Sequence, residues 1–440
     1  MKQIGLLIFL FVIFNNTSPA QESWTLERCI QHALEHNIDL KIQQNYEQKA
    51  TYNRQQSQWD MLPSVNGWGN SGFDFRRSTN QNNEITSGTT YNMNYGISSS
   101  LTLFSGFTRM NTISALKYNE MAGSEGSNYT SNLLTISVTD LFTQALYQKA
   151  LVKVIEEQLS ISIFEAGRIA ANIEAGLLEA VAQLEIDAIV SGQELHLHRA
   201  QNNYKLTKLK LAHLIEIPEE SEFEISSAEI DVLMPTDNQL TVNDVYTMAS
   251  QHYPTILQKE YEMEYYQKML GVSKGNAAPS LRLNGSYSSA FFSTDTLQNG
   301  AQTPMGTQFD NYLNPSFGLS LSVPIFNGRQ NDFNIKQRKI DLENALYTLE
   351  NEKKTIRREI EGAIMRLESL NLEYQYASNN LMSVEKSFET FRERYRLGLV
   401  NSTEFMNAQS LLAHAQSELL RAKYSWVVQK YTLELYTGSQ

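Results

Sequence analysis

Residues 317–328 read FGLSLSVPIFNG, and this stretch joins a strand pattern to a long run of helix-forming residues. Apolar residues occupy every second position from Phe317 to Val323, with Gly and Ser between them. This is the pattern of a strand with one apolar face and one polar face. The stretch ends at Gly328, and residues 329–397 then contain a single Gly and no Pro. A run of that length without helix breakers predicts one very long helix directly after the strand.

The same succession of landmarks occurs twice in the chain. Three pairs of motifs match in order: Leu62-Pro63-Ser64 with Ala278-Pro279-Ser280, Leu103-Phe104-Ser105-Gly106 with Ile325-Phe326-Asn327-Gly328, and Gly176-Leu177 with Gly398-Leu399. The offset is 216 residues for the first pair and 222 for the other two. We therefore predict a tandem repeat, with copies over residues 21–216 and 240–440 and an equatorial linker over 217–239.

Each repeat is predicted to carry one β-hairpin, over residues 64–104 in the first copy and 280–326 in the second. Apolar and polar residues alternate clearly in three of the four strands, and less clearly over residues 65–75, where glycines blur the pattern. Length differences collect in exposed loops, so we place the hairpin loops at residues 76–89 and 293–311. The polar faces almost lack Lys and Glu, which suits a water-filled lumen. A soluble sheet, apolar inside and polar outside, is the alternative.

Each repeat is then predicted to end in a long antiparallel helical hairpin. The first runs over residues 106–213 and reverses near residue 176, and the second runs over residues 328–437 and reverses near residue 398. A Gly at the end of a helix supplies the left-handed residue that such a reversal needs. Narrow apolar stripes indicate coiled-coil packing, for example Ile356, Ile360, Ala363, Leu367 and Leu370.

The amino terminus reads as a cleavable secretory signal over residues 1–20. Lys2 provides the positive start, residues 4–14 are almost entirely apolar, and Ser18-Pro19-Ala20 is a small-x-small cleavage site. The apolar part is too short to span a bilayer. The formal net charge of −12 argues against a nucleic-acid partner. Cys29 is the single cysteine, so an internal disulfide is excluded.

The strands predict an oligomer. Four strands per chain cannot close a barrel, and open sheet edges are not tolerated in lipid. Several copies must therefore combine if the strands enter a membrane, and three copies of four strands give a barrel of twelve, inside the known range of bacterial barrels. The need to pair the edges does not itself fix the number three.

On these motifs the chain resembles the TolC-like outer-membrane efflux protein family over residues 22–438. Further marks are Trp24-Thr25-Leu26, Ala33-Leu34, Val323-Pro324, Arg394-Tyr395 and Ala408-Gln409. The resemblance implies a mainly α fold with membrane β structure: a homotrimer with a shared 12-stranded outer-membrane β-barrel and a periplasmic α-helical barrel of long antiparallel coiled-coil helices. It also implies a passive exit duct of a tripartite efflux or type I secretion system, docked to a periplasmic adaptor (membrane fusion protein) and an inner-membrane pump.

The same resemblance implies candidate gate residues. In the family, two acidic positions after the second helical reversal narrow the tunnel, and here they fall on Glu404 and Asn407, of which only the first is acidic. The 222-residue offset places the first-copy counterparts at Ala182 and Glu185. Glu404 and Glu185 are therefore the candidate lumen acids, since a ring of three carboxylates would attract cations. The alternative is that both are solvated acids on the outer face.

The two helical reversals are candidate docking sites for the adaptor, again by resemblance. The residues concerned are Gly176, Leu177, Gly398 and Leu399. The glycines alone would satisfy the turns, but a Leu beside each Gly favours contact with a partner.

The sequence shows no catalytic constellation, phosphate-binding loop or nucleophile motif, so we predict no enzyme, no cofactor and no metal site. His196 and His198 stand two positions apart and do not share a helix face. A soluble periplasmic coiled-coil scaffold or adaptor is the alternative function. It explains the long helices but not the four amphipathic strands. The exported substrate, the particular adaptor and pump, and the resting state of the tip are not encoded in recognisable form.

Overall fold

The structure is a computed structural model, and it describes residues 24–79, 85–217, 223–226, 241–298 and 301–438. The predicted signal over residues 1–20 and most of the predicted linker over 217–239 lie outside these residues. Within the described part of the chain, no helix is both long enough and apolar enough to cross a membrane.

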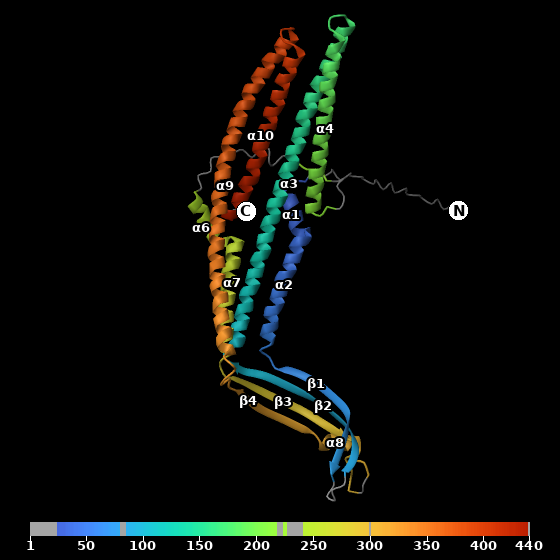
Figure 1. Cartoon of the computed structure of the whole chain (residues 1–440), viewed down its shortest axis with the longest axis vertical. Coiled ribbons are helices and arrows are strands. Elements are labelled where there is room, and N and C mark those ends of the chain that lie inside the picture. The colour runs from blue at the N-terminus through green and yellow to red at the C-terminus, as the bar shows by residue number, and fades with distance from the viewer. Residues whose placement is uncertain (1–23, 80–84, 218–222, 227–240, 299–300, 439–440) are drawn as a thin grey trace, which may run out of the picture. The chain divides into compact units, whose positions relative to one another are not determined.

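The element order repeats, as Figure 1 shows: two helices, two strands and two long helices, and then the same series again with one short helix added. The helices are α1 (Leu26–His36), α2 (Ile38–Trp59), α3 (Thr108–Glu174), α4 (Ala180–Leu214), α6 (Val242–His252), α7 (Pro254–Gly275), α8 (Met305–Asn311), α9 (Gln330–Arg396) and α10 (Ser402–Thr437). The strands are β1 (Ser64–Thr79), β2 (Ile85–Ser105), β3 (Ser280–Phe292) and β4 (Asn314–Ser322). The predicted class, long helices plus four strands, is confirmed.

The chain divides into two compact units, and each unit takes segments from both sequence repeats. Unit 1 comprises Met1–Lys41, Thr130–Ala249 and Arg357–Gln440, and unit 2 comprises Ile42–Tyr129 and Ser250–Ile356. Unit 1 therefore holds both helical reversals, and unit 2 holds the whole sheet.

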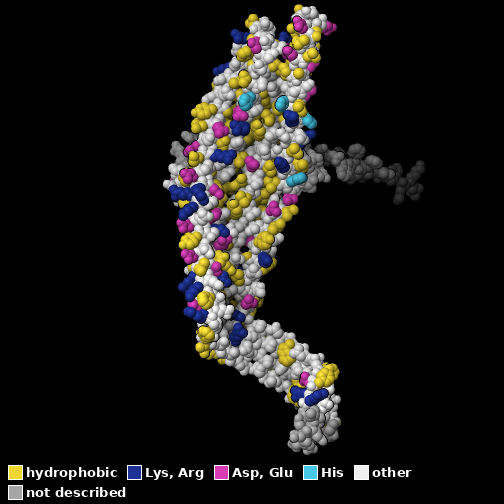
Figure 2. Space-filling model, viewed as in Figure 1, with side chains coloured by type: hydrophobic (Ala, Val, Ile, Leu, Met, Phe, Trp, Pro, Cys, Tyr) yellow, Lys and Arg dark blue, Asp and Glu magenta, His cyan; other side chains and the backbone are white. Residues whose placement is uncertain are grey.

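The sheet of unit 2 is antiparallel throughout, in the order β1-β2-β3-β4 (Figure 1). Its register aligns side chains of one kind across neighbouring strands. Leu101 is opposite Leu283, which is opposite Leu319, and Ser98 is opposite Ser286, which is opposite Ser316. Since successive residues of a strand point to opposite faces, one face is apolar and the other carries hydroxyl and amide groups. On the side shown in Figure 2, charged side chains gather on the helices, whereas the strands display few.

Two details of the hairpins differ from the sequence-based prediction. The loop predicted over residues 76–89 is wrong at both ends, because strand pairing continues to Thr79 opposite Ile85. That boundary was placed where the two repeats differ in length, and backbone pairing can continue through such a segment.

The second difference is α8, an unpredicted short helix inside the second hairpin. Its Gln308 side chain is buried, accepts a hydrogen bond of 2.8 Å from the Phe292 amide and donates one of 2.9 Å to the Thr303 carbonyl. The Ser289 hydroxyl also donates to the Phe309 carbonyl. The bonds with Phe292 and Ser289 attach α8 to β3, and they join residues too far apart for a local pattern to reveal.

Both strands that lead into the longest helices end in the same backbone turn. Gly106 and Phe107 have φ of 59° and 62°, and Gly328 and Arg329 have φ of 64° and 62°. Two successive left-handed residues turn the chain sharply, and the Gly of each Phe-x-Gly landmark occupies the first of these positions without a side-chain clash. The landmark is thus explained by the turn it makes.

Candidate functional site at the helical tips

The two helical hairpins of unit 1 reverse through the same glycine cap. Gly176 and Gly398 both have φ of 73°. In the first tip, the Gly176 amide donates to the Ile173 carbonyl (2.9 Å) and the Leu177 amide donates to the Asn172 carbonyl (2.8 Å). The second tip repeats both bonds at the matching positions, with lengths of 3.0 and 2.8 Å. This pair of bonds satisfies carbonyl groups that a helix end leaves without partners.

The leucine after each glycine is exposed. Leu177 is 72 % exposed and Leu399 is 69 % exposed. Each backbone amide serves the cap, but neither side chain is needed for the turn. Further apolar side chains are exposed beside the tips: Leu178, Val181, Leu184 and Leu397. Such a group of exposed apolar side chains is typical of a contact surface.

Glu404 has a local structural role that the sequence-based hypothesis did not include. It stands in the first turn of α10 and completes a capping box with Asn401. The Glu404 carboxylate accepts a 3.1 Å bond from the Asn401 amide, and the Asn401 side-chain oxygen accepts a 2.8 Å bond from the Glu404 amide. An Asn followed three residues later by a Glu is the sequence signature of this cap, so the sequence alone is sufficient to predict this role of Glu404.

The candidate gate residues lie on exposed faces of their helices. Glu404 and Asn407 are both exposed on α10, whereas the intervening Phe405 and Met406 are buried. On α4, Glu185 is exposed and its neighbour Ile186 is buried. The three polar residues are therefore free of the packed core.

Beneath the tips, the two hairpins share one core cluster, which we call the tip core. The first hairpin contributes two isoleucines and the second contributes mainly aromatic side chains. The buried members are Ile169, Ile186, Phe388, Tyr395, Phe405, Met406 and Ala408. The rings of Tyr395 and Phe405 stack at 4.5 Å with an interplanar angle of 6°. Apolar burial of this kind holds the two hairpins of one chain together.

A charged group from the first hairpin completes the tip core. The Arg168 guanidinium lies 4.3 Å from the centre of the Tyr395 ring and also forms an ion pair of 3.0 Å with Glu165. Glu165 is only 3 % exposed, so the arginine neutralises a buried carboxylate while it lies over an aromatic ring of the other hairpin. Tyr395 is part of a motif quoted above, but its partner stands more than two hundred residues away in the sequence, and no local pattern connects them.

Two histidines of α1 lie close together. Within the described residues, no group of three or more His, Cys, Asp or Glu is placed to hold a metal ion. The rings of His32 and His36 stack on α1 with their centres 4.1 Å apart. Their Nδ1 atoms lie 2.7 and 3.0 Å from the carbonyl oxygens of Ile215 and His32, respectively, so both rings are engaged with backbone.

Comparison with known proteins identifies the family to which this chain belongs. Residues 29–215 and 245–439 match the family model described as outer membrane efflux protein. Since these two segments make up most of the chain, the protein belongs to the outer membrane efflux protein family. It is an outer-membrane efflux channel protein.

Individual relatives are similar at low identity. The chain is 21 % identical over 413 residues to the cation efflux system protein CusC of Escherichia coli O157:H7, which covers 93 % of this chain and 84 % of CusC. It is 21 % identical over 208 residues to the outer membrane protein TolC of Escherichia coli K12, and that match spans 46 % of this chain and 41 % of TolC. The crystal structure of the Campylobacter jejuni CmeC outer membrane channel superposes with a TM-score of 0.78 at 16 % identity, covering 94 % of this chain and 86 % of CmeC. The predicted resemblance, fold class and outer-membrane location are thereby confirmed.

Proposed function

We propose that three copies of this chain form one continuous duct that carries cargo passively, and that the duct works with a periplasmic adaptor and an inner-membrane pump. The observation that carries the proposal is the sheet with two free edges and two chemically different faces. The chain offers polar strand faces and long helices but no catalytic centre in its described residues, which fits a conduit rather than an enzyme.

The free edges support self-association. Within the described residues, the order β1-β2-β3-β4 leaves one edge of β1 and one edge of β4 without a strand partner. All nine residues of β4 are exposed. Unpaired backbone groups are costly in lipid, so β4 of one copy needs a strand such as β1 of the next. Three sheets joined in this way would turn their polar faces toward a common lumen.

The tip core supports a gate near the helical reversals. It connects the two hairpins of a chain, so loosening it would let one hairpin move relative to the other. Glu404, Asn407 and Glu185 lie outside the core on exposed faces, where they are available to line a lumen. A ring of three Glu404 carboxylates, one from each copy, would favour cations over anions.

The exposed leucines support docking of an adaptor at the tips. Leu177 and Leu399 occupy equivalent places in two equivalent turns, so a trimer would present six similar contact points. An adaptor that binds both tips needs a repeated apolar pocket for the Leu side chain. The cap geometry places each leucine immediately after a rigid turn, which limits the conformational entropy lost on binding.

Single-channel conductance in a planar bilayer tests the duct, and paired variants at Glu404 test the gate. Glu404→Gln removes the charge but keeps a side chain that serves a capping box, whereas Glu404→Ala removes both. We expect Glu404→Gln to reduce cation selectivity with little change in stability. Equal selectivity of wild type and Glu404→Gln would move the gate away from Glu404. Folded protein that never inserts into the bilayer would contradict the duct itself.

Docking is tested separately with the double variant Leu177→Ser and Leu399→Ser. We expect normal conductance, because the turns keep their glycines, but loss of efflux in cells that carry the matching pump. The matched control is Leu411→Ser, an exposed leucine on α10 outside both turns, 60 % exposed, which should leave efflux unchanged. Efflux that survives the double variant would contradict docking through these leucines.

A further inference from the structure

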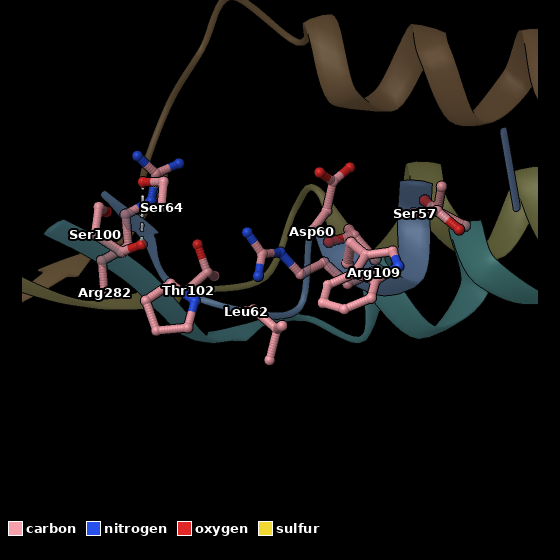
Figure 3. A pocket seen from close by; sticks show the side chains of 12 residues that line it. Ser57, Asp60, Leu62, Ser64, Ser100, Thr102, Arg109 and Arg282 are labelled. Carbon is pink, nitrogen blue, oxygen red and sulfur yellow. Dashed lines mark hydrogen bonds between the residues drawn. The ribbon is translucent and has the colours of Figure 1, made fainter. Parts of the chain in front are cut away.

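A cavity of about 510 Å³ lies in unit 2, where α2 leads into β1 and β2 leads into α3. Figure 3 shows its polar side chains, which come from α2, β1, β2, α3, β3 and the loop between α2 and β1. Those that matter for its chemistry are Asp60, Ser64, Ser100, Thr102, Arg109 and Arg282. The helical tips and their candidate residues lie in the other unit, so this cavity is separate from them.

Two arginines, Arg109 and Arg282, line the cavity. Nη1 of Arg109 is buried and has no hydrogen-bond partner within the described part of the chain. Neither Arg109 nor Arg282 takes part in any ion pair that the described residues form. A guanidinium is charged at all relevant pH values, and a buried charged donor without an acceptor is more costly than a neutral one. The cavity therefore presents donors that an external acceptor would satisfy.

The strand register places Arg282 on the polar face of the sheet. Arg282 is opposite Thr102 on β2, and Ser100, two residues earlier on β2, is opposite Ser64 on β1. Residues two apart on a strand share a face, so Thr102 and Ser100 both belong to the face that carries hydroxyl groups. Arg109 approaches from the first turn of α3. The start of this helix is fixed by the Thr108 hydroxyl oxygen, which lies 2.8 Å from both the carbonyl oxygen and the hydroxyl oxygen of Ser105.

The second repeat provides an internal comparison. At the repeat offsets, Arg109 corresponds to Asn331 and Asp60 corresponds to Asn276. There the Asn331 amide donates a 3.4 Å bond to the Asn276 carbonyl, so the equivalent positions are neutral and contact each other. The charges of Arg109 and Asp60 are thus a property of the first repeat, and the turn between strand and helix does not require them.

We propose that this cavity binds one anionic group, a phosphate or a carboxylate, between the Arg109 and Arg282 guanidinium groups. A guanidinium presents a planar fork of donors that matches both anions. The nearby hydroxyl groups of Ser100 and Thr102 add neutral donors, whereas the Ser64 hydroxyl donates a 3.4 Å bond to the Ser100 carbonyl. Asp60 contributes one negative charge against two positive charges, which suits a single anionic group and disfavours a densely charged ligand.

The inference deepens the proposed function, on which it rests for one point only. If the polar strand face lines the duct, each copy holds a cationic site in the lumen, in contrast to the acidic residues at the tips. Binding of an anion does not itself require conduction. Direct binding and conductance therefore fail independently, and the two proposals remain distinguishable.

Isothermal titration calorimetry with inorganic phosphate tests the site on the purified full-length protein in neutral detergent. We expect the double variant Arg109→Gln and Arg282→Gln to bind phosphate at least tenfold more weakly than wild type. The control is Arg329→Gln, which removes an arginine at the matching turn of the second repeat, where its side chain is 70 % exposed. This control should stay within twofold of wild type.

Single variants keep the proposal testable if the double variant does not fold. Arg282 lies on a strand face and its side chain is exposed, so Arg282→Gln should fold normally and still weaken binding severalfold. Arg109→Lys keeps the charge but loses the fork and should fall between wild type and Arg109→Gln. Wild-type protein that binds no phosphate, or a double variant that binds it as wild type does, would overturn the proposal.

The anionic group has two sources, a lipid headgroup or a soluble molecule. The titration is repeated in nanodiscs made of phosphatidylcholine alone and of phosphatidylcholine with phosphatidylglycerol. A weaker apparent phosphate affinity with the anionic lipid, lost in the double variant, would support the site and assign it to a headgroup. Equal affinity in the two nanodiscs would support a site for soluble molecules. Competition that persists in the double variant would contradict a lipid site in this cavity.

Discussion

The two strand-to-helix turns have nearly the same backbone but different surroundings. Gly106 and Gly328 differ in φ by only a few degrees. A Cβ on Gly106 would lie 2.3 Å from the Gly275 carbonyl oxygen, whereas a Cβ on Gly328 would meet nothing within 4 Å. The first turn is therefore packed against the end of α7, and the second stands open within the chain. A tandem repeat conserves the local turn while each copy acquires its own neighbours, so each copy serves as a control for the other.

The largest loss of stability is expected where the first turn packs against the end of α7. A Cβ on Gly275 would lie 2.3 Å from the Gly106 carbonyl oxygen and 2.7 Å from a Thr108 methyl group. Backbone cannot give way cheaply, so Gly275→Ala should lower the free energy of unfolding by roughly 3 kcal/mol. Gly328→Ala should cost about 1–2 kcal/mol, since only the left-handed backbone is disfavoured.

Far-ultraviolet circular dichroism during thermal unfolding in detergent measures both glycine variants. We expect the apparent melting temperature of Gly275→Ala to be lower than that of Gly328→Ala. Equal shifts would mean that the two turns have equally open surroundings in the assembled protein, and would remove the asymmetry described above.

The second effect concerns the unequal contributions of the two hairpins to the tip core. Arg168→Gln leaves the buried Glu165 without its cation and removes the charge above the Tyr395 ring. We expect a loss of about 2 kcal/mol, in the range of charge-assisted hydrogen bonds and desolvated cation–π contacts. The control, Arg392→Gln, breaks an ion pair of the same spacing with Glu389, in which both side chains are more than half exposed.

Such an exposed pair contributes at most about 0.5 kcal/mol on a helix, so Arg392→Gln should be nearly neutral. A double-mutant cycle of Arg168→Gln with Tyr395→Leu, followed by thermal unfolding, isolates the contact between the hairpins. A coupling energy near zero would show that Arg168 acts only through Glu165, and the proposed link between the hairpins would be lost.

Local rules explain which of these features the sequence predicts. Alternation gave the strands, the absence of Pro and Gly gave the long helices, and the two Gly-Leu pairs gave the reversals, because each depends on neighbouring residues. The approach of Gly275 to Gly106, the Arg168–Tyr395 contact and the attachment of α8 through Gln308 join distant segments, and no periodicity encodes them. The role of Glu404 in capping α10 is local, and it follows from the Asn-x-x-Glu spacing of residues 401–404.

A third, smaller effect is expected at the helix starts that follow the two tips. Asn401 caps α10 through its side chain, whereas the equivalent Glu179 makes no side-chain cap bond to α4. Asn401→Ala should therefore destabilise its tip by about 1 kcal/mol, the usual effect of losing such a cap. Glu179→Ala should change little, and Glu179→Asn should stabilise the first tip. Hydrogen exchange of the first turns of α4 and α10 measures all three variants, and equal responses of Asn401→Ala and Glu179→Ala would refute the difference in capping.

The smallest effect is a pH dependence confined to one repeat. Thr25 and Thr241 stand at equivalent helix starts, and their hydroxyl oxygens accept bonds from the amides of Arg28 and Asp244, respectively. Only the second repeat places a carboxylate there. Hydrogen bonds from the Thr241 hydroxyl and then from its backbone amide lower the pKa of Asp244. A lowered pKa in the folded state means that this stabilisation is fully present above the ordinary Asp pKa of about 3.9 and is lost as the pH falls through the folded value.

Hydrogen exchange at two matched amides detects this difference. Cys29 donates to the Thr25 carbonyl at 3.0 Å, and Val245 donates to the Thr241 carbonyl at 3.1 Å. Between about pH 6 and pH 3, protection corrected for intrinsic exchange should fall at the Val245 amide, because the Asp244 carboxylate becomes protonated. Protection should stay level at the Cys29 amide, since Arg28 stands in the place of Asp244 and does not titrate in this range. Asp244→Asn should remove the pH dependence at Val245. A parallel fall at both amides, or a fall that persists in Asp244→Asn, would assign the change to the surrounding unit instead of the cap. The two helix starts have the same backbone bonding, so only the titration of a group in one cap can make their protection differ.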